Sequence, residues 1–249
     1  MALLDTGDAL VTGTPVIEGQ QYIPGQALPV YHPLGDQTEG EVIVAGMNLM
    51  GYDAMALGPR DLSLGLEVLR QRMAQAEFPF LSANVVLAES GELLAPAYAV
   101  LEVGPYRLGV LGLTRRPKEP IAGLNVGDAQ AAIERWLPEV RAEADVVVLL
   151  TNLDLRTASE LVRAVPGVDL VVAALPGQLP GNVVHVPDTG TLAVTAEQAM
   201  ERHSGRRVGE LVLTVEPDGT ITVRSWRSVD MTKEFVDDVE MAALLKRYR

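Results

Sequence analysis

Short apolar runs that end in glycine or aspartate alternate with helical patterns along most of this chain. The clearest run is VVVLL at 146–150, which is continuously apolar and therefore predicts a strand buried on both faces. Amphipathic segments separate such runs. Over 66–76, for example, Leu66, Leu69 and Met73 share one helical face. This alternation predicts a layered α/β domain.

Turn and cap residues place further elements. The sequence predicts a strand at 2–4, a helix over 42–50, a strand at 54–57, and a long polar connection over 13–40. It also predicts a tight hairpin at Gly104-Pro105 and a helix through Ala144 with Asp128 as its N-cap. Asp218-Gly219 predicts a second hairpin, because such turns need positive backbone angles. A final helix is expected over 234–249, with the following residues toward the core: Phe235, Val239, Ala243 and Leu244.

Composition excludes several classes of partner and chemistry. The formal net charge of −13 opposes binding to nucleic-acid polymers and to anionic membranes, which are held by clustered basic residues. The absence of cysteine excludes disulfides, a thiolate nucleophile and cysteine-ligated zinc. The only histidines, His32, His185 and His203, are too far apart in sequence to form a local metal motif.

The sequence predicts no membrane attachment. No apolar run approaches the roughly 20 residues of a membrane span, and the first residues lack the pattern of a signal peptide. A cytoplasmic protein and a processed exported chain therefore both remain open, and the compartment is not decided by the sequence.

Polar residues gather where predicted strands end. These positions are DTGD at 5–8, GPRD at 58–61, TNLD at 151–154 and AALPG at 173–177. Ligand-binding groups in α/β sheets collect at the carboxyl ends of strands, so we expect a functional site to be built from these four segments.

These segments, in this order, resemble landmarks of the 5'-nucleotidase branch of the calcineurin-like metallophosphoesterases. The resemblance covers nearly the whole chain and includes LLDTGDALVTGTP, MNLMGYDAMALG, YRLGVLGLT and ADVVVLLTNLDL. It implies a metallophosphoesterase-like two-sheet β-sandwich flanked by helices. It also implies two domain segments: 1–230 as the metallophosphoesterase-like domain, and 231–249 as a helix resembling the linker to a substrate-binding domain.

Enzymes of this family hold two metal ions, which clamp a phosphate and activate a bridging hydroxide. Their ligands come from an Asp-x-His strand, a Gly-Asp, an Asn-His-Glu loop, a lone His and a Gly-His-x-His. The resemblance makes Asp8, in Gly7-Asp8, the match to the metal-bridging carboxylate. The Asp-x-His strand has no match, because the sequence starts at the family's second strand.

The other matched positions depart from the family pattern. Pro59 replaces the Asn ligand, Arg60 the His that protonates the leaving group, and Asp61 the Glu, while Ser63 replaces the Asp that orients that His. Asn152 replaces the lone His, and Leu175 and Gly177 replace the last two. Proline offers no side-chain ligand and arginine stays protonated. The resemblance therefore implies a catalytically degenerate domain, a binding or assembly module with no expected cofactor.

Other interpretations stay open. A divergent phosphoesterase could hold one hard cation, Mg²⁺ or Ca²⁺, through Asp8, Asp61 and Asp154, with Asn152 nearby, and hydrolyse a nucleotide or small phosphate ester. The chain could also be one part of a split enzyme. Alternatively, Asp5 and the other acids form a solvated rim, and Asp8 is an ordinary turn carboxylate.

Two expectations concern structure directly. The Arg60 guanidinium should lie within hydrogen-bonding distance of a carboxylate from Asp5, Asp8 or Asp154, since clustered acids need a compensating cation. The strand that begins at Ala2 should present an unpaired edge, which a second copy or another chain would cover.

Overall fold

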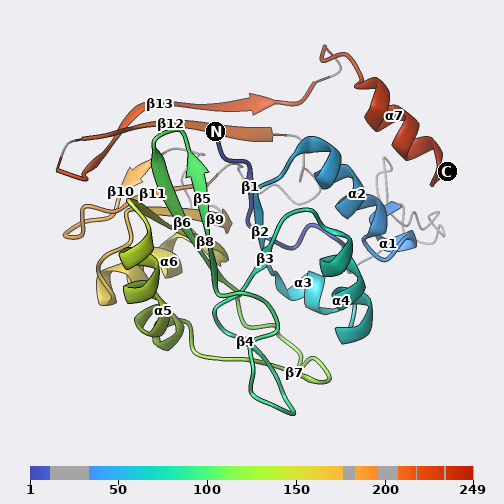
Figure 1. The fold of residues 1–249 in the computed structure, drawn as a ribbon, viewed down its shortest axis with the longest axis horizontal. Coiled ribbons are helices and arrows are strands. Elements are labelled where there is room, and N and C mark those ends of the chain that lie inside the picture. Colours follow the sequence, from blue (N-terminus) through green and yellow to red (C-terminus); the bar gives the residue numbers. More distant parts are fainter. Residues whose placement is uncertain (12–33, 176–182, 196–206, 217, 233, 249) are drawn as a thin grey trace, which may run out of the picture.

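The computed structural model describes the chain except for residues 12–33, 176–182, 196–206, 217, 233 and 249 (Figure 1). Most of the predicted connection at 13–40, as well as Gly177, His32 and His203, therefore lie outside the described residues.

The strands of the described residues form two main sheets and two smaller ones. The three-stranded sheet is parallel, in the order β1 (Leu4–Asp5), β2 (Ala54–Ala56), β3 (Phe80–Leu81). The six-stranded sheet has the order β10 (Val184–His185), β11 (Leu192–Val194), β9 (Leu170–Leu175), β8 (Val146–Asp154), β6 (Tyr106–Leu113), β5 (Tyr98–Val103). The smaller pairs are β4 (Val85–Leu87) with β7 (Leu124–Val126), and β12 (Arg207–Val215) with β13 (Ile221–Asp230).

The helices lie outside the two main sheets (Figure 1). They are α1 (Leu34–Gln37), α2 (Glu41–Met50), α3 (Pro59–Leu62), α4 (Leu66–Gln75), α5 (Ala129–Glu143), α6 (Leu155–Ala164) and α7 (Val239–Lys246). None of the helices in the described part of the chain has the length and apolar character that a membrane crossing requires.

Strand β8 shows how the layers are built. Val147 and Leu149 point to one face and join the core beneath α5 and α6. Val146, Val148 and Leu150 point to the other face and pack against β2 and β3 of the second sheet. Successive side chains of a strand alternate between faces, so a continuously apolar strand supplies both cores.

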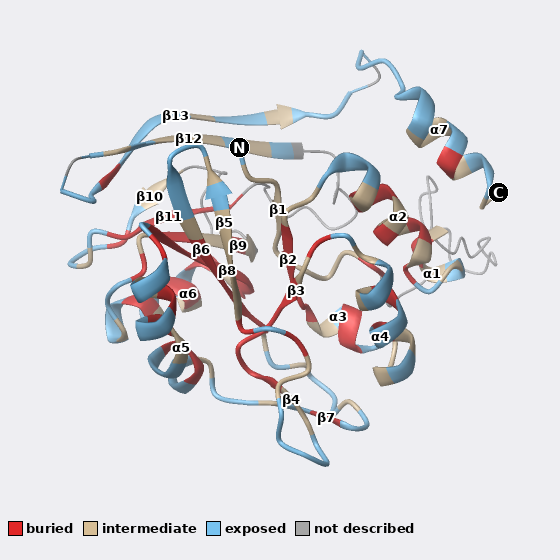
Figure 2. Ribbon diagram, viewed as in Figure 1, coloured by how far each residue is buried: buried red, intermediate tan, exposed pale blue. Residues whose placement is uncertain are grey.

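A third core completes the layers. It lies between the three-stranded sheet and the helices α2 and α4, and includes Met55, Leu57, Leu69 and Phe80. Figure 2 shows the buried residues concentrated in the strands and on the inward sides of the helices. The result is a two-sheet sandwich with helices on both outer faces, as the sequence predicted.

The β12–β13 hairpin covers the sandwich core at the top of Figure 1, because Leu211, Leu213, Ile221 and Trp226 pack against it. Its turn contains Gly219 with φ of 86°, in agreement with the predicted Asp-Gly turn. Strand β1 pairs only with β2 among the described residues, so its other side is a sheet edge.

The prediction for the last helix was wrong in its start and its face. Helix α7 begins at Val239, because the Asp238 carboxylate accepts a 2.8 Å hydrogen bond from the Met241 N–H and caps it there. Phe235 lies before the helix and is 52% exposed, and Val239 is 81% exposed; Ala243 is also exposed. Only Leu244 of the predicted face is buried, on the side that packs against α2.

Candidate functional site

The loops after β1 and β2 are in close contact. Gly7 has φ of 93° and Asp8 has φ of 63°, so both lie in the left-handed region. A β-carbon at Gly7 would lie 2.5 Å from the Ala56 carbonyl oxygen and 2.8 Å from the Gly58 nitrogen. Only glycine permits this approach. Asp5 begins the turn, since its Oδ1 accepts a 2.8 Å bond from the Gly7 N–H.

Asp61 joins the two loops. It lies in the short helix α3, which begins at Pro59, a first helical position where no backbone N–H is needed. The Asp61 side chain is fully buried. Its Oδ2 accepts hydrogen bonds from the N–H groups of Asp8 and Gly58, both 2.8 Å, and its Oδ1 accepts one from Leu10 at 3.0 Å. Both carboxylate oxygens are therefore engaged by backbone donors.

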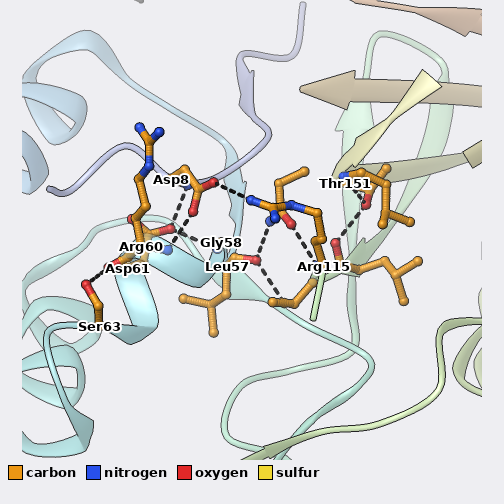
Figure 3. A network of polar contacts seen from close by, with 12 residues as sticks. Asp8, Leu57, Gly58, Arg60, Asp61, Ser63, Arg115 and Thr151 are labelled. Atoms are coloured by element: carbon orange, nitrogen blue, oxygen red, sulfur yellow. Dashed lines mark hydrogen bonds and ion pairs between the residues drawn. The ribbon is translucent and has the colours of Figure 1, made fainter. Parts of the chain in front are cut away.

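The side chain of Asp8 reaches across to two arginines. Its Oδ1 accepts a 2.7 Å bond from the Arg60 backbone N–H, and its Oδ2 lies 3.6 Å from an Nη of Arg115. The expected contact of the Arg60 guanidinium was wrong: within the described residues it forms no hydrogen bond or ion pair, and Figure 3 shows it pointing away from Asp8. Arg60 lies on an exposed turn of α3, so its backbone, not its charge, faces the carboxylate.

Arg115 was missed by the sequence analysis. It follows β6, and its N–H donates a 2.7 Å bond to Oδ1 of Asn152 in the neighbouring parallel strand β8. The Asn152 amide in turn donates to the Leu57 carbonyl at 2.7 Å, which the Thr114 hydroxyl also contacts at 2.8 Å. The signal that would have found Arg115 is its place just beyond a predicted strand, like the other segments of the site.

The carboxyl groups influence one another. Burial raises the pKa of Asp61 to about 7. The three N–H bonds to its carboxylate lower this pKa, and the negative charge of Asp8 raises it further. Burial also raises the pKa of Asp5 to about 6, with the Gly7 N–H opposing the shift and the Asp8 charge adding to it. The site therefore contains two acids that hold a proton more tightly than free aspartate.

Comparisons with known proteins support the same fold and branch. A 5'-nucleotidase of Vibrio cholerae is 30% identical over 129 residues, which are 49% of this chain and 23% of that protein. The solved 5'-nucleotidase precursor of Thermus thermophilus superposes with a TM-score of 0.77 at 24% identity, covering 99% of this chain and 48% of that one. The calcineurin-like phosphoesterase YfkN of Bacillus subtilis gives 0.69 at 19%, covering 99% and 82%.

The chain is similar in sequence and in fold to members of the 5'-nucleotidase branch of the calcineurin-like metallophosphoesterases. No protein-family model matches it. The chain matches less than a third of the length of its curated relatives, at 15% to 30%. The likeness is to the N-terminal domain of this branch, as the sequence indicated.

The structure brings together most of the positions that this 5'-nucleotidase-like domain was expected to use. Asp8, Asp61 and Asn152 lie in one network at the ends of β1, β2 and β8 (Figure 3). Asp154 is engaged elsewhere: it caps α6 by accepting bonds from the N–H and hydroxyl of Thr157, at 2.9 and 2.7 Å. Burial of Asp154 opposes its ionisation, but these bonds outweigh it and its pKa is lowered.

The remaining predicted positions contribute less. The Ser63 hydroxyl donates to the Arg60 carbonyl at 2.6 Å, so it holds the end of α3. Leu175 ends β9, and His185 lies in β10 at the far edge of its sheet. In the part of the chain that the structure describes, no group of three or more histidine or acidic side chains is arranged to hold a metal ion.

Proposed function

We propose that this metallophosphoesterase-family domain does not carry out metal-dependent phosphate ester hydrolysis and serves instead as a binding or assembly module. The observation that supports the proposal is that the oxygen atoms that could bind a metal ion already accept hydrogen bonds or lie in an ion pair. Both oxygens of Asp61 accept backbone N–H bonds, and both the oxygen and the nitrogen of the Asn152 amide are bonded. Asp8 accepts a bond from the Arg60 backbone N–H and forms an ion pair with Arg115. A metal ion would have to break these bonds, so the donor set does not fit a two-metal centre.

The acid–base chemistry of the loop supports the same proposal. Arg60 stands where the resemblance implies a proton donor, and a guanidinium stays protonated at any relevant pH. Pro59 offers no side-chain donor or acceptor. The Ser63 hydroxyl is committed to the Arg60 carbonyl. None of these three residues can protonate a leaving group, and Asp61, the acid of this loop, is fully buried.

The test is hydrolysis together with metal content. The purified chain is assayed with an aryl phosphate and with a nucleoside 5'-monophosphate, in EDTA and with Mg²⁺, Ca²⁺, Mn²⁺ or Zn²⁺. An active 5'-nucleotidase serves as the positive control, and bound metal is measured by elemental analysis. We expect no turnover above the buffer rate and no stoichiometric transition metal. Oxygen ligands disfavour Zn²⁺, and Mn²⁺ would find the oxygens of Asp61 and Asn152 already engaged by backbone donors. Metal-dependent turnover would refute the proposal.

One observation favours a second candidate, a divergent phosphoesterase that uses a single hard cation. Oδ2 of Asp8 has a weak partner, since its 3.6 Å separation from Arg115 exceeds a normal hydrogen bond. A single Mg²⁺ or Ca²⁺ could use this oxygen together with water. Turnover with Mg²⁺ or Ca²⁺ that is lost in Asp8→Asn, with folding intact, would support this candidate over the first.

The proposed module would bind through the edge of β1. Within the described residues this strand has one neighbour, β2, and an unpaired edge favours addition of another strand. We propose a second copy or another chain as the cover. Light scattering at micromolar concentration tests self-association. A clean monomer whose N-terminal strand is covered by its own chain would contradict this part of the proposal.

A further inference from the structure

Three acidic side chains lie on the two touching loops. Asp5, Asp8 and Asp61 are linked through the backbone of 7 and 8, because the Gly7 N–H bonds Asp5 and the Asp8 N–H bonds Asp61. Asp61 is fully buried, whereas Asp5 and Asp8 are partly exposed, and the side chain of Asp8 is 19% exposed. Clustered carboxylates at low solvent exposure repel one another unless a cation lies beside them.

Arg115 is the one basic side chain that forms an ion pair with this acidic cluster in the described part of the chain. Its guanidinium lies 3.6 Å from Oδ2 of Asp8, and its side chain is 34% exposed. Its Nε is buried and has no hydrogen-bond partner. A buried donor without a partner costs free energy, so something else must hold the guanidinium in this place.

The backbone of Arg115 is fixed by the neighbouring strands. Its N–H bonds Asn152, whose amide bonds the Leu57 carbonyl at the end of β2. Asn152 is 1% exposed and cannot move without breaking both bonds. The buried network thus fixes the backbone from which the Arg115 side chain extends, and Figure 3 shows the guanidinium directed toward Asp8.

We propose that Arg115 is the built-in cation of the acidic cluster and occupies the side of Asp8 that a metal ion would need. The domain then needs no divalent cation to be stable, and removal of the guanidinium opens a weak site for Mg²⁺ or Ca²⁺ at Asp8. This inference rests on the proposed function, because it explains why the donor set does not fit a two-metal centre.

The test is thermal unfolding of the wild type, Arg115→Ala and Arg115→Gln in EDTA and in MgCl₂ or CaCl₂, with Arg60→Ala as the matched control. In EDTA both Arg115 variants should unfold about 2–4 °C below the wild type, the shift expected for one partly buried ion pair in a chain of this length. Mg²⁺ or Ca²⁺ should restore most of this loss. The wild type and Arg60→Ala should not respond to either cation.

Arg115→Gln keeps most of the packing of the stem, so it reports on the charge if Arg115→Ala does not fold. Arg115→Lys should retain more stability than Arg115→Gln and should remain insensitive to the cations. If the neutral Arg115 variants match Arg60→Ala and ignore Mg²⁺ and Ca²⁺, the inference is wrong while the proposed function stands. Metal-dependent hydrolysis by the wild type would instead remove the proposed function.

Discussion

Replacing Gly58 by alanine tests whether close contact of the first two loops holds the site together. A β-carbon at Gly58 would lie 2.4 Å from the Asp8 backbone nitrogen and 2.3 Å from its Oδ1. The loops would have to separate by about 1 Å to restore ordinary contact at 3.4 Å. The bonds from Asp8 N–H to Asp61 and from Arg60 N–H to Asp8, now 2.8 and 2.7 Å, would then exceed the roughly 3.2 Å limit of a normal N–H bond.

The expected cost follows from these two effects. Overpacking costs about 1–3 kcal/mol. Each buried donor that loses its partner costs about 1–3 kcal/mol. The free energy of unfolding of Gly58→Ala should therefore fall by roughly 2–6 kcal/mol, from overpacking and from the Asp8 N–H, while the exposed Arg60 N–H can bond to water instead.

Urea unfolding measures this loss, and Gly127→Ala is the matched control. Gly127 is also a loop glycine, its φ is not positive, and a β-carbon there would meet the Asn84 carbonyl at an ordinary 3.5 Å. Stability of the control should rise by about 0.4–1 kcal/mol through the unfolded chain. If Gly58→Ala unfolds at the same urea concentration as the control, close loop contact does not stabilise this site.

Three further outcomes are expected. The pKa of Asp61 is raised from 3.8 to about 7 in the folded protein, so its contribution to stability is complete below pH 3.8 and is lost as pH rises through 7. The urea midpoint of the wild type should therefore fall relative to that of Asp61→Asn over this range, and a relative rise would show that the N–H bonds to Asp61 dominate. Tyr248→Phe removes a 2.8 Å hydrogen bond to Glu41, so the free energy of unfolding should fall by about 1 kcal/mol and hydrogen exchange in α7 should become faster. Unchanged exchange would show that packing alone holds α7. Gly46→Ala should stabilise helix α2 by up to about 1 kcal/mol, because alanine favours a helix over glycine and the new methyl would meet Met241 at an ordinary 3.6 Å. A lower melting temperature would mean that this contact is too tight.

Much of the sandwich could be predicted because its signals are local. The apolar run in β8 gives a strand buried on both faces, and the Asp-Gly pair gives the β12–β13 turn. The convergence of Asp8, Asp61 and Asn152 was also predictable, since each follows or ends a parallel strand.

Side-chain direction could not be predicted in the same way. Arg60 was the expected cation because it lies in a matched motif, but only its backbone N–H contacts Asp8. The place of Arg115 just beyond β6 is a local signal, but its contact with Asp8 depends on the pairing of β6 with β8, which joins distant segments. The face of α7 was wrong for a related reason: an apolar pattern does not specify which neighbour a helix packs against.

The Asp61 carboxylate gives the two loops a shared opening event. The amide protons of Asp8, Leu10 and Gly58 all point to its oxygens, although they belong to segments about 50 residues apart. None of the three can exchange with solvent while Asp61 stays in place, so their exchange is expected to be slow and correlated. A surface region that would ordinarily fluctuate as two independent loops therefore behaves as one cooperative unit, whose opening is governed by a single buried side chain.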